Sequence, residues 1–157
     1  RFEPFMEQVK KGLPEGVKFE RNHVDFLRAA SPKVQAMLTK SVVVAEQLGM
    51  GDKLVTAIFN YIQVQKAVVT SEKDIRNIFV LNGADGKKFD KLMKSFSVNS
   101  KAKFMKKSQD NMAKKGALKG VPTMIVNGKY RINTQELDRN NFEQDYQDLI
   151  KHLLTLK

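Results

Sequence analysis

Apolar residues recur at helical spacing over most of the chain. This spacing predicts a helix near residues 2–9, several helices between residues 31 and about 116, and a last helix from residue 142. Ser31-Pro32 is typical of a helix start, and so is Ser71 with Asp74 three residues later. The last helix has the cleanest apolar stripe, made by Phe142, Tyr146, Leu149, Ile150, Leu153 and Leu154.

Two stretches predict β-structure instead. Val17 to Val24 alternates between two sets of side chains, as a half-buried strand does. Between residues 119 and 130, Pro122 opens a short apolar strand that leads to Asn127-Gly128 and a second strand. Asn-Gly favours a type I′ hairpin turn, in which both central residues need positive φ. Pro cannot donate to a strand ladder and therefore suits a strand's first residue.

The first helix and the first strand both lack an expected neighbour. Phe2, Phe5, Met6 and Val9 are in helical register from the start, with no capping residue ahead of them. A strand that follows a helix usually has a parallel partner before that helix, because crossover connections are right-handed. We therefore expect a strand upstream of Arg1.

Composition limits the class of protein. A length of 157 residues and an apolar fraction of 41% suit one domain, or one domain with an insertion. The chain has no cysteine, so disulfides, zinc–thiolate sites and thiol nucleophiles are excluded within these residues. No apolar run approaches the ~20 residues that a bilayer requires, and the start as given has no signal-peptide pattern.

Positive charge is concentrated in one segment. Eleven Lys and two acids between residues 87 and 119 supply +9 of the net +11. This pattern indicates either a surface for nucleic acid or an acidic partner, or the solvated side of two amphipathic helices. We favour the solvated side, because no exposed aromatic or Arg is predicted among the lysines. We expect Phe89 and Phe96 to lie in a buried apolar stripe together with Leu92 and Met93.

Several motifs resemble the DsbA family of periplasmic thiol:disulfide oxidoreductases. They are Leu13–Lys18, His23-Val24, Gly120–Tyr130 and Asp138, and the resemblance covers essentially the whole chain. It implies an α/β, thioredoxin-like fold with an inserted all-helical domain. Residues 1–24 and 110–157 would form the thioredoxin-like domain, incomplete at its N-terminus, and residues 25–109 the insertion.

The same resemblance implies thiol–disulfide exchange, with the catalytic Cys-x-x-Cys upstream of residue 1. A thiolate at a helix N-terminus has a lowered pKa, which makes its disulfide a strong oxidant. Such an enzyme donates disulfides to reduced, cysteine-containing polypeptides in the periplasm, and a membrane partner of the DsbB type reoxidises it. No metal or organic cofactor and no nucleic acid would be involved, and the complete protein would be a monomer.

The resemblance also implies a set of site residues. Pro122 would be cis opposite the disulfide and would hold the backbone of Val121 toward a bound peptide; without the resemblance, a trans Pro is the ordinary expectation. Met6, Val121 and Phe142 would line an apolar groove, with Thr134 and Gln135 at its polar rim. Met6 and Phe142 are equally compatible with simple core positions.

Charged and imidazole groups complete the set. Glu3 and Arg21 match an acid–base pair beneath the family's cysteines, although the family commonly has Lys where this chain has Arg21. Arg does not release a proton at ordinary pH, and a plain surface ion pair is an equal alternative. His23 and His152 have no ligand spacing around them and are expected to be structural or superficial.

Two other functions stay open. One is a redox-inactive thioredoxin-like protein that holds peptides, and the other is a basic helical nucleic-acid binder. The residues encoded just upstream of Arg1 separate the first of these from an oxidoreductase. Because the strands around the expected missing strand would be unpaired, we also expect the isolated 157-residue polypeptide not to fold stably.

Overall fold

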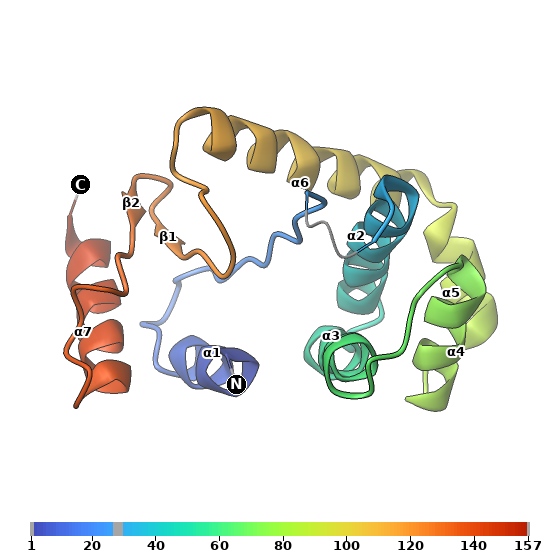
Figure 1. Ribbon diagram of the computed structural model, residues 1–157, viewed down its shortest axis with the longest axis horizontal. Coiled ribbons are helices and arrows are strands. Elements are labelled where there is room, and N and C mark those ends of the chain that lie inside the picture. Colours follow the sequence, from blue (N-terminus) through green and yellow to red (C-terminus); the bar gives the residue numbers. More distant parts are fainter. Residues whose placement is uncertain (1, 27–29, 157) are drawn as a thin grey trace. The chain divides into compact units, whose positions relative to one another are not determined.

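The computed structural model describes residues 2–26 and 30–156, with side chains from residue 4 onward. The chain divides into two compact units (Figure 1). The first unit comprises residues 1–21 and 112–157, and the helical unit comprises residues 22–111. Each unit has its own cluster of buried apolar residues.

The first unit places two helices and a hairpin around one core. Its elements are α1 (Phe2–Lys11), β1 (Ile125–Val126), β2 (Tyr130–Arg131) and α7 (Phe142–Thr155). Both helices present the apolar stripes that their sequences predicted. The buried cluster contains Phe5, Met6, Val9, Val126, Ile132, Leu137, Tyr146 and Ile150.

The hairpin has the turn chemistry expected from Asn-Gly. Asn127 and Gly128 have φ of 53° and 66°, and the Lys129 amide donates to the Val126 carbonyl over 3.0 Å. β1 and β2 are antiparallel, with Val126 opposite Tyr130, so that Lys129 also lies in the loop. The strands are two residues each, shorter than predicted, although an Ile132 amide donating to Met124 over 3.1 Å continues the pairing. The Val121–Pro122 peptide bond is cis, in agreement with the family resemblance.

The strand predicted over Val17–Val24 does not form among the described residues. The segment has no strand assignment, yet its burial alternates as predicted: Val17, Phe19, Arg21 and His23 are half-buried, whereas Lys18, Glu20 and Asn22 are exposed. Alternating side chains establish which face is buried, but a strand also requires a neighbouring backbone to pair with. The described part of the chain provides no such neighbour here, and the prediction of a strand was wrong on that point.

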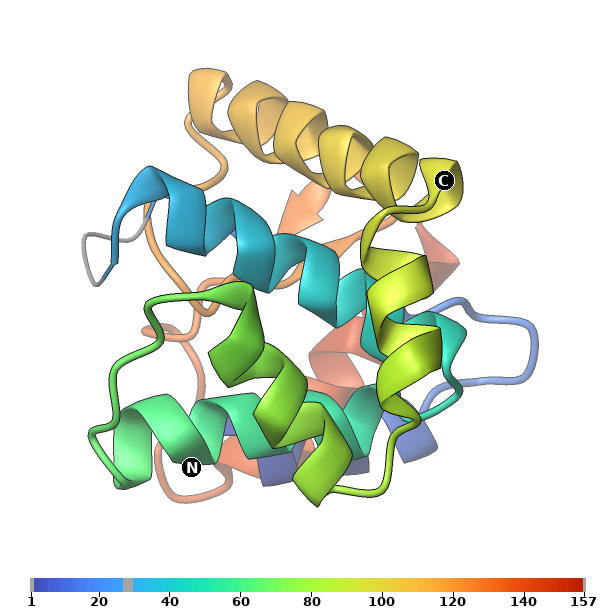
Figure 2. The same cartoon turned by 90° about the vertical axis from the view of Figure 1, so that its right-hand side faces the viewer.

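The helical unit consists of helices joined by short connections (Figure 2). They are α2 (Pro32–Gln47), α3 (Gly51–Phe59), the π-helical turn η1 (Asn60–Val64), α4 (Glu72–Leu81), α5 (Gly86–Met93) and α6 (Phe96–Lys114). Ser31 caps α2, and Ser71 with Asp74 forms a capping box on α4, as the sequence predicted. Asp85 caps α5 by accepting from the amides of Lys87 and Lys88. Between residues 31 and 110 the described chain contains no strand.

The prediction of a buried apolar stripe in the lysine-rich segment is only partly correct. Phe89 and Met93 are buried and Leu92 is half-buried, but Phe96 is 86% exposed. The stripe assumed one continuous helix, whereas α5 ends at Met93 and α6 begins at Phe96. The break resets the helical phase, and Val98 and Met105 take the inward positions of α6.

Candidate functional site

The first unit contains a hollow of about 250 Å³ beside the hairpin. Two of the five predicted groove residues, Thr134 and Phe142, meet the predicted catalytic residue Pro122 in its wall. The remaining wall residues are Thr123, Met124, Ile132 and Tyr146. The surface therefore combines apolar side chains with hydroxyl groups, a mixture suited to an extended peptide.

Sequence reasoning missed four of these wall residues, and a clear sequence signal was present for one of them, Tyr146. Tyr146 follows Phe142 by one helical turn and therefore shares its face. Met124 and Ile132 lie opposite each other in the register of the hairpin, which places them on one face. Counting outward from a two-residue Asn127-Gly128 turn would pair Met124 with Arg131, so Ile132 is located only once Lys129 is known to lie in the loop.

Aromatic packing fixes one wall of the hollow. The ring of Phe5 lies 5.7 Å from that of Phe142 and 5.1 Å from that of Tyr146, centroid to centroid, and thus joins α1 to α7. Tyr146 is only 1% exposed, and its burial raises the pKa of the phenol to about 12. The phenol therefore stays neutral across the physiological range.

The other proposed groove residues lie outside this wall. Met6 is 5% exposed and belongs to the core cluster. Val121 is 47% exposed, next to Pro122, and Gln135 is exposed on the loop after β2. The structure thus brings Pro122, Thr134 and Phe142 together, whereas Met6, Val121 and Gln135 do not line the hollow.

The ion pair observed at Arg21 differs from the proposed one. The Arg21 guanidinium donates to Glu7 Oε1 over 2.7 Å, and both side chains are largely shielded from solvent. Glu7 is one helical turn beyond Glu3 on α1, so a carboxylate of this helix does reach Arg21. The side chain of Glu3 lies outside the described residues, and the Glu3–Arg21 pair stays a prediction.

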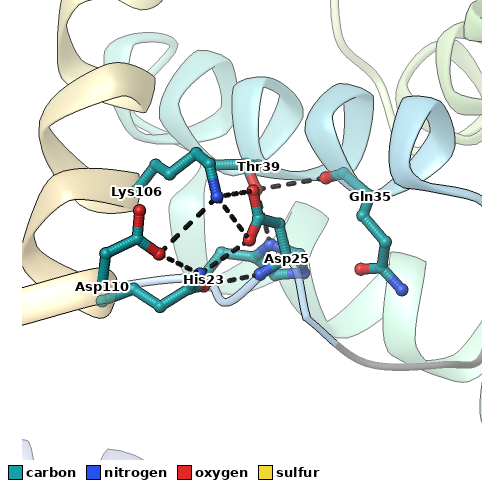
Figure 3. Close-up of polar contacts among 7 residues, drawn as sticks. His23, Asp25, Gln35, Thr39, Lys106 and Asp110 are labelled. Carbon is teal, nitrogen blue, oxygen red and sulfur yellow. Dashed lines mark hydrogen bonds and ion pairs between the residues drawn. The ribbon is translucent and has the colours of Figure 1, made fainter. Parts of the chain in front are cut away.

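His23 takes part in a hydrogen-bond chain within the helical unit (Figure 3). His23 Nδ1 lies 2.8 Å from Thr39 Oγ1, and Thr39 Oγ1 donates to the Gln35 carbonyl over 3.1 Å. Because the only hydroxyl proton of Thr39 is used there, His23 Nδ1 is the donor to Thr39. Burial lowers the pKa of His23, and the nearby Asp25 opposes that shift. This environment suits a structural histidine, whereas His152 is exposed in the last turn of α7.

Asp25 is tied to α6 beside this chain (Figure 3). Its amide donates to Gln109 Oε1, and Gln109 Nε2 donates to Asp25 Oδ1, both over 2.7 Å. Lys106 Nζ lies 3.2 Å from Asp25 Oδ2 and 3.6 Å from Asp110 Oδ1. Burial pushes the pKa of Asp25 upward, but the hydrogen bonds from Gln109 and Lys106 outweigh it and leave the pKa lowered. The oxygen and the nitrogen of the Gln109 side-chain amide both bind Asp25, although the two residues are 84 positions apart in the sequence.

The described residues contain neither a cluster of metal ligands nor a membrane-spanning helix. Within residues 2–26 and 30–156, no three acidic or histidine side chains are grouped so as to hold a metal ion. None of the helices in the same ranges is long and apolar enough to cross a bilayer.

Comparisons with known proteins agree on one family. The family model described as "DSBA-like thioredoxin domain" matches residues 6–147. The thiol:disulfide interchange protein DsbA of Escherichia coli K12 is 38% identical over 150 residues, which cover 94% of this chain and 68% of that protein. DsbA of Pectobacterium carotovorum is 38% identical over 154 residues, which cover 96% and 70%.

Solved structures give the same result for the fold. A Proteus mirabilis DsbA with a non-covalently bound peptide superposes with a TM-score of 0.85 and is 29% identical. The superposition covers 98% of this chain and 79% of that one. A thioredoxin fold of the DsbA type, with mostly helical content and a small sheet, is therefore shown. The chain belongs to the DSBA-like thioredoxin domain family.

Proposed function

We propose that these residues form the substrate-facing part of a thiol:disulfide oxidoreductase that donates disulfides to secreted polypeptides in the periplasm. One observation carries the proposal: the hollow joins Pro122, Thr134 and Phe142 in a member of the DsbA family. The sequence contains no cysteine, so the proposal places the reactive Cys-x-x-Cys upstream of residue 1.

The exchange proceeds in two steps that balance electrons. A substrate thiolate attacks the enzyme disulfide, forms a mixed disulfide and releases one enzyme thiolate. A second substrate thiolate then attacks the mixed disulfide, so that the substrate gains a disulfide and the enzyme is left with two thiols. A membrane partner of the DsbB type takes the two electrons and restores the enzyme disulfide.

The role of this chain is to hold the peptide while that exchange occurs. Phe142 and Pro122 would contact apolar side chains of the substrate, Thr134 would donate or accept at its backbone, and the exposed Val121 would pair with it through backbone groups. The Proteus mirabilis relative binds the peptide PWATCDS non-covalently, which supports an extended, cysteine-containing ligand. Met6 and Gln135 would border the ligand beyond the hollow, and Glu3 with Arg21 would lie beneath the cysteines.

The proposal also includes the arrangement of domains. Residues 25–109 would form a helical domain inserted into a thioredoxin-like domain made of residues 1–24 and 110–157. The hydrogen bonds between Asp25 and Gln109 support it, because they hold the two ends of the inserted segment together. The complete protein would act as a monomer.

The test uses the natural polypeptide that carries these residues, beginning with its intact mass and thiol content. Its oxidised form should oxidise a peptide dithiol stoichiometrically, and a DsbB-type membrane fraction should make the reaction catalytic. Thr134→Phe narrows the hollow and should raise the Kd for a PWATCDS peptide about tenfold or more. Thr56→Phe, on an exposed position of α3, is the matched control and should leave the Kd unchanged.

A second function is a redox-inactive peptide-binding protein, favoured by the complete absence of cysteine from the sequence. In that case, peptide binding should still respond to Thr134→Phe, but no thiol would titrate and no dithiol would be oxidised. Peptide binding that ignores Thr134→Phe would contradict both functions.

A further inference from the structure

The outward face of α6 combines aromatic rings with lysines. Phe96 is 86% exposed and Phe104 is 60% exposed, whereas Val98, Met105 and Gln109 point into the helical unit. Lys103 and Lys107 follow Phe96 by 7 and 11 residues, which places all three along one line of the helix. We call Phe96, Lys103, Phe104 and Lys107 the basic-aromatic face. In Figures 1 and 2, α6 runs along the outside of the helical unit.

The positive charge of this segment is not neutralised by its acids. Asp90 accepts from Arg76 at 2.8 Å, and Asp110 lies 3.6 Å from Lys106. These are the only two acids between residues 87 and 119, a segment that carries eleven Lys. Within the described chain, Lys103 and Lys107 have no carboxylate within 4.0 Å. Lys101 flanks the face and lies 5.7 Å from the ring centroid of Phe104.

We propose that the basic-aromatic face docks on a membrane surface that carries anionic lipid headgroups. Exposed aromatic rings insert at the boundary of headgroups and acyl chains, while lysines beside them pair with phosphate and keep their charged ends in water. Each Lys near an anionic surface adds to the attraction, which falls off within a Debye length. The proposal requires only the surface of α6 and is independent of the redox function.

Nucleic acid fits this face less well than lipid. The segment from residue 87 to 119 contains no Arg, which is the side chain that recognises phosphate and guanine with two parallel hydrogen bonds. Single-stranded nucleic acid binds in grooves whose aromatic residues stack on bases, whereas these rings project from the convex surface of one helix. A membrane is flat and deformable and needs no groove.

The test is co-sedimentation of the natural polypeptide with vesicles of phosphatidylcholine alone or with 30–40% phosphatidylglycerol (about the anionic fraction that gives a strong surface potential). We expect binding to the anionic vesicles only, and its loss as salt rises. Lys103→Gln with Lys107→Gln should lower the binding constant by about fivefold for each lysine. Lys33→Gln with Lys53→Gln changes the net charge equally at exposed positions of α2 and α3 and should have little effect.

The aromatic contribution has its own variants. Phe96→Ser with Phe104→Ser should weaken vesicle binding about tenfold or more, whereas Leu81→Ser, at an 86% exposed position of α4, should not. Equal binding to neutral vesicles, or equal losses in the test and control variants, would overturn the proposal. So would retention on single-stranded DNA under conditions in which anionic vesicles retain nothing, since that result would assign the face to nucleic acid.

Discussion

The hydrogen bonds around His23 show which nitrogen of its ring carries the proton. Nδ1 must donate to Thr39, because Thr39 gives its own proton to the Gln35 carbonyl. The ring nitrogen that can still accept a proton is therefore Nε2. Protonation there would place a charge in a shielded position, where burial disfavours it and the nearby Asp25 favours it.

We predict that His23 titrates below its ordinary pKa of about 6.5. Unfolded chains then take up a proton that the folded helical unit resists, so stability present above pH ~6.5 should decline as the pH falls through the folded pKa. Proton NMR of the two histidine signals measures this, and His152→Gln assigns them. A His23 midpoint at or above 6.5 would contradict the argument that burial controls its protonation.

Tyr146 predicts a loss of folding stability at high pH, whereas His23 predicts one at low pH. Its pKa is raised to about 12, so the folded chain stays protonated at a pH at which the unfolded chain ionises. Stability is complete below pH ~10 and should be lost as the pH rises toward 12, by about 2–3 kcal/mol from this group. Denaturant titrations of the natural polypeptide and of Tyr146→Phe should converge at neutral pH and diverge above pH 10. Parallel curves throughout would show that Tyr146 ionises freely.

At the scale of elements, the hairpin is determined by two residues and a register. Asn127 and Gly128 supply the positive φ values, and the Asn127 side chain also donates to the carbonyls of Leu153 and Leu156 at the end of α7. The turn therefore sets the hairpin and contacts the helix that supplies Phe142 and Tyr146. We therefore expect a change in the turn to alter the positions of the residues that line the hollow.

We predict that Gly128→Ala destabilises the first unit by about 1 kcal/mol, because Ala resists the left-handed φ of 66°. No atom lies within 4 Å of a Cβ at this position, so the cost is conformational and not steric. Gly120→Ala is the matched control, since Gly120 has equal space and no positive φ. Thermal or urea unfolding of the natural polypeptide provides the comparison, and equal midpoints for the two variants would refute the strain argument.

At the scale of the whole molecule, the two units differ in what they need from elsewhere. The helical unit buries sixteen residues in one cluster of its own and closes its ends through Asp25 and Gln109. The first unit has a hairpin of two-residue strands and a segment, residues 17–21, that joins no sheet among the described residues. A two-stranded hairpin alone is marginal in water.

We therefore predict that residues 1–157, expressed by themselves, protect only the helical unit from hydrogen exchange. A fragment of residues 22–111 should unfold cooperatively, and Gln109→Ala should destabilise it by about 1–3 kcal/mol, because the charged Asp25 loses its buried partner. Gln63→Ala, exposed in η1, serves as the control. Strong protection of residues 124–132 in the isolated polypeptide would contradict the prediction and favour a complete, cysteine-free binding protein.

The sequence by itself determined the local features. Helical periodicity, the caps at Ser31 and Ser71, and the Asn-Gly turn depend on neighbours within a few residues, and the structure agrees with each. The resemblance to the DsbA family also predicted the thioredoxin-like fold, and two of its five predicted groove residues, Thr134 and Phe142, lie in the hollow with Pro122. The helices, the caps and the turn can be predicted because short-range sterics and hydrogen bonding decide them.

Tertiary structure decided everything that depends on a distant partner. The alternation in residues 17–24 predicted a buried face, but whether a strand forms depends on backbone from another part of a sheet. Arg21 meets Glu7, and Met6 enters the core, because the packing of α1 selects which of its side chains point where. Phe96 is exposed because α5 ends at Met93 and a new helix, α6, begins at Phe96. Helical spacing counted across this interruption therefore predicted the wrong face.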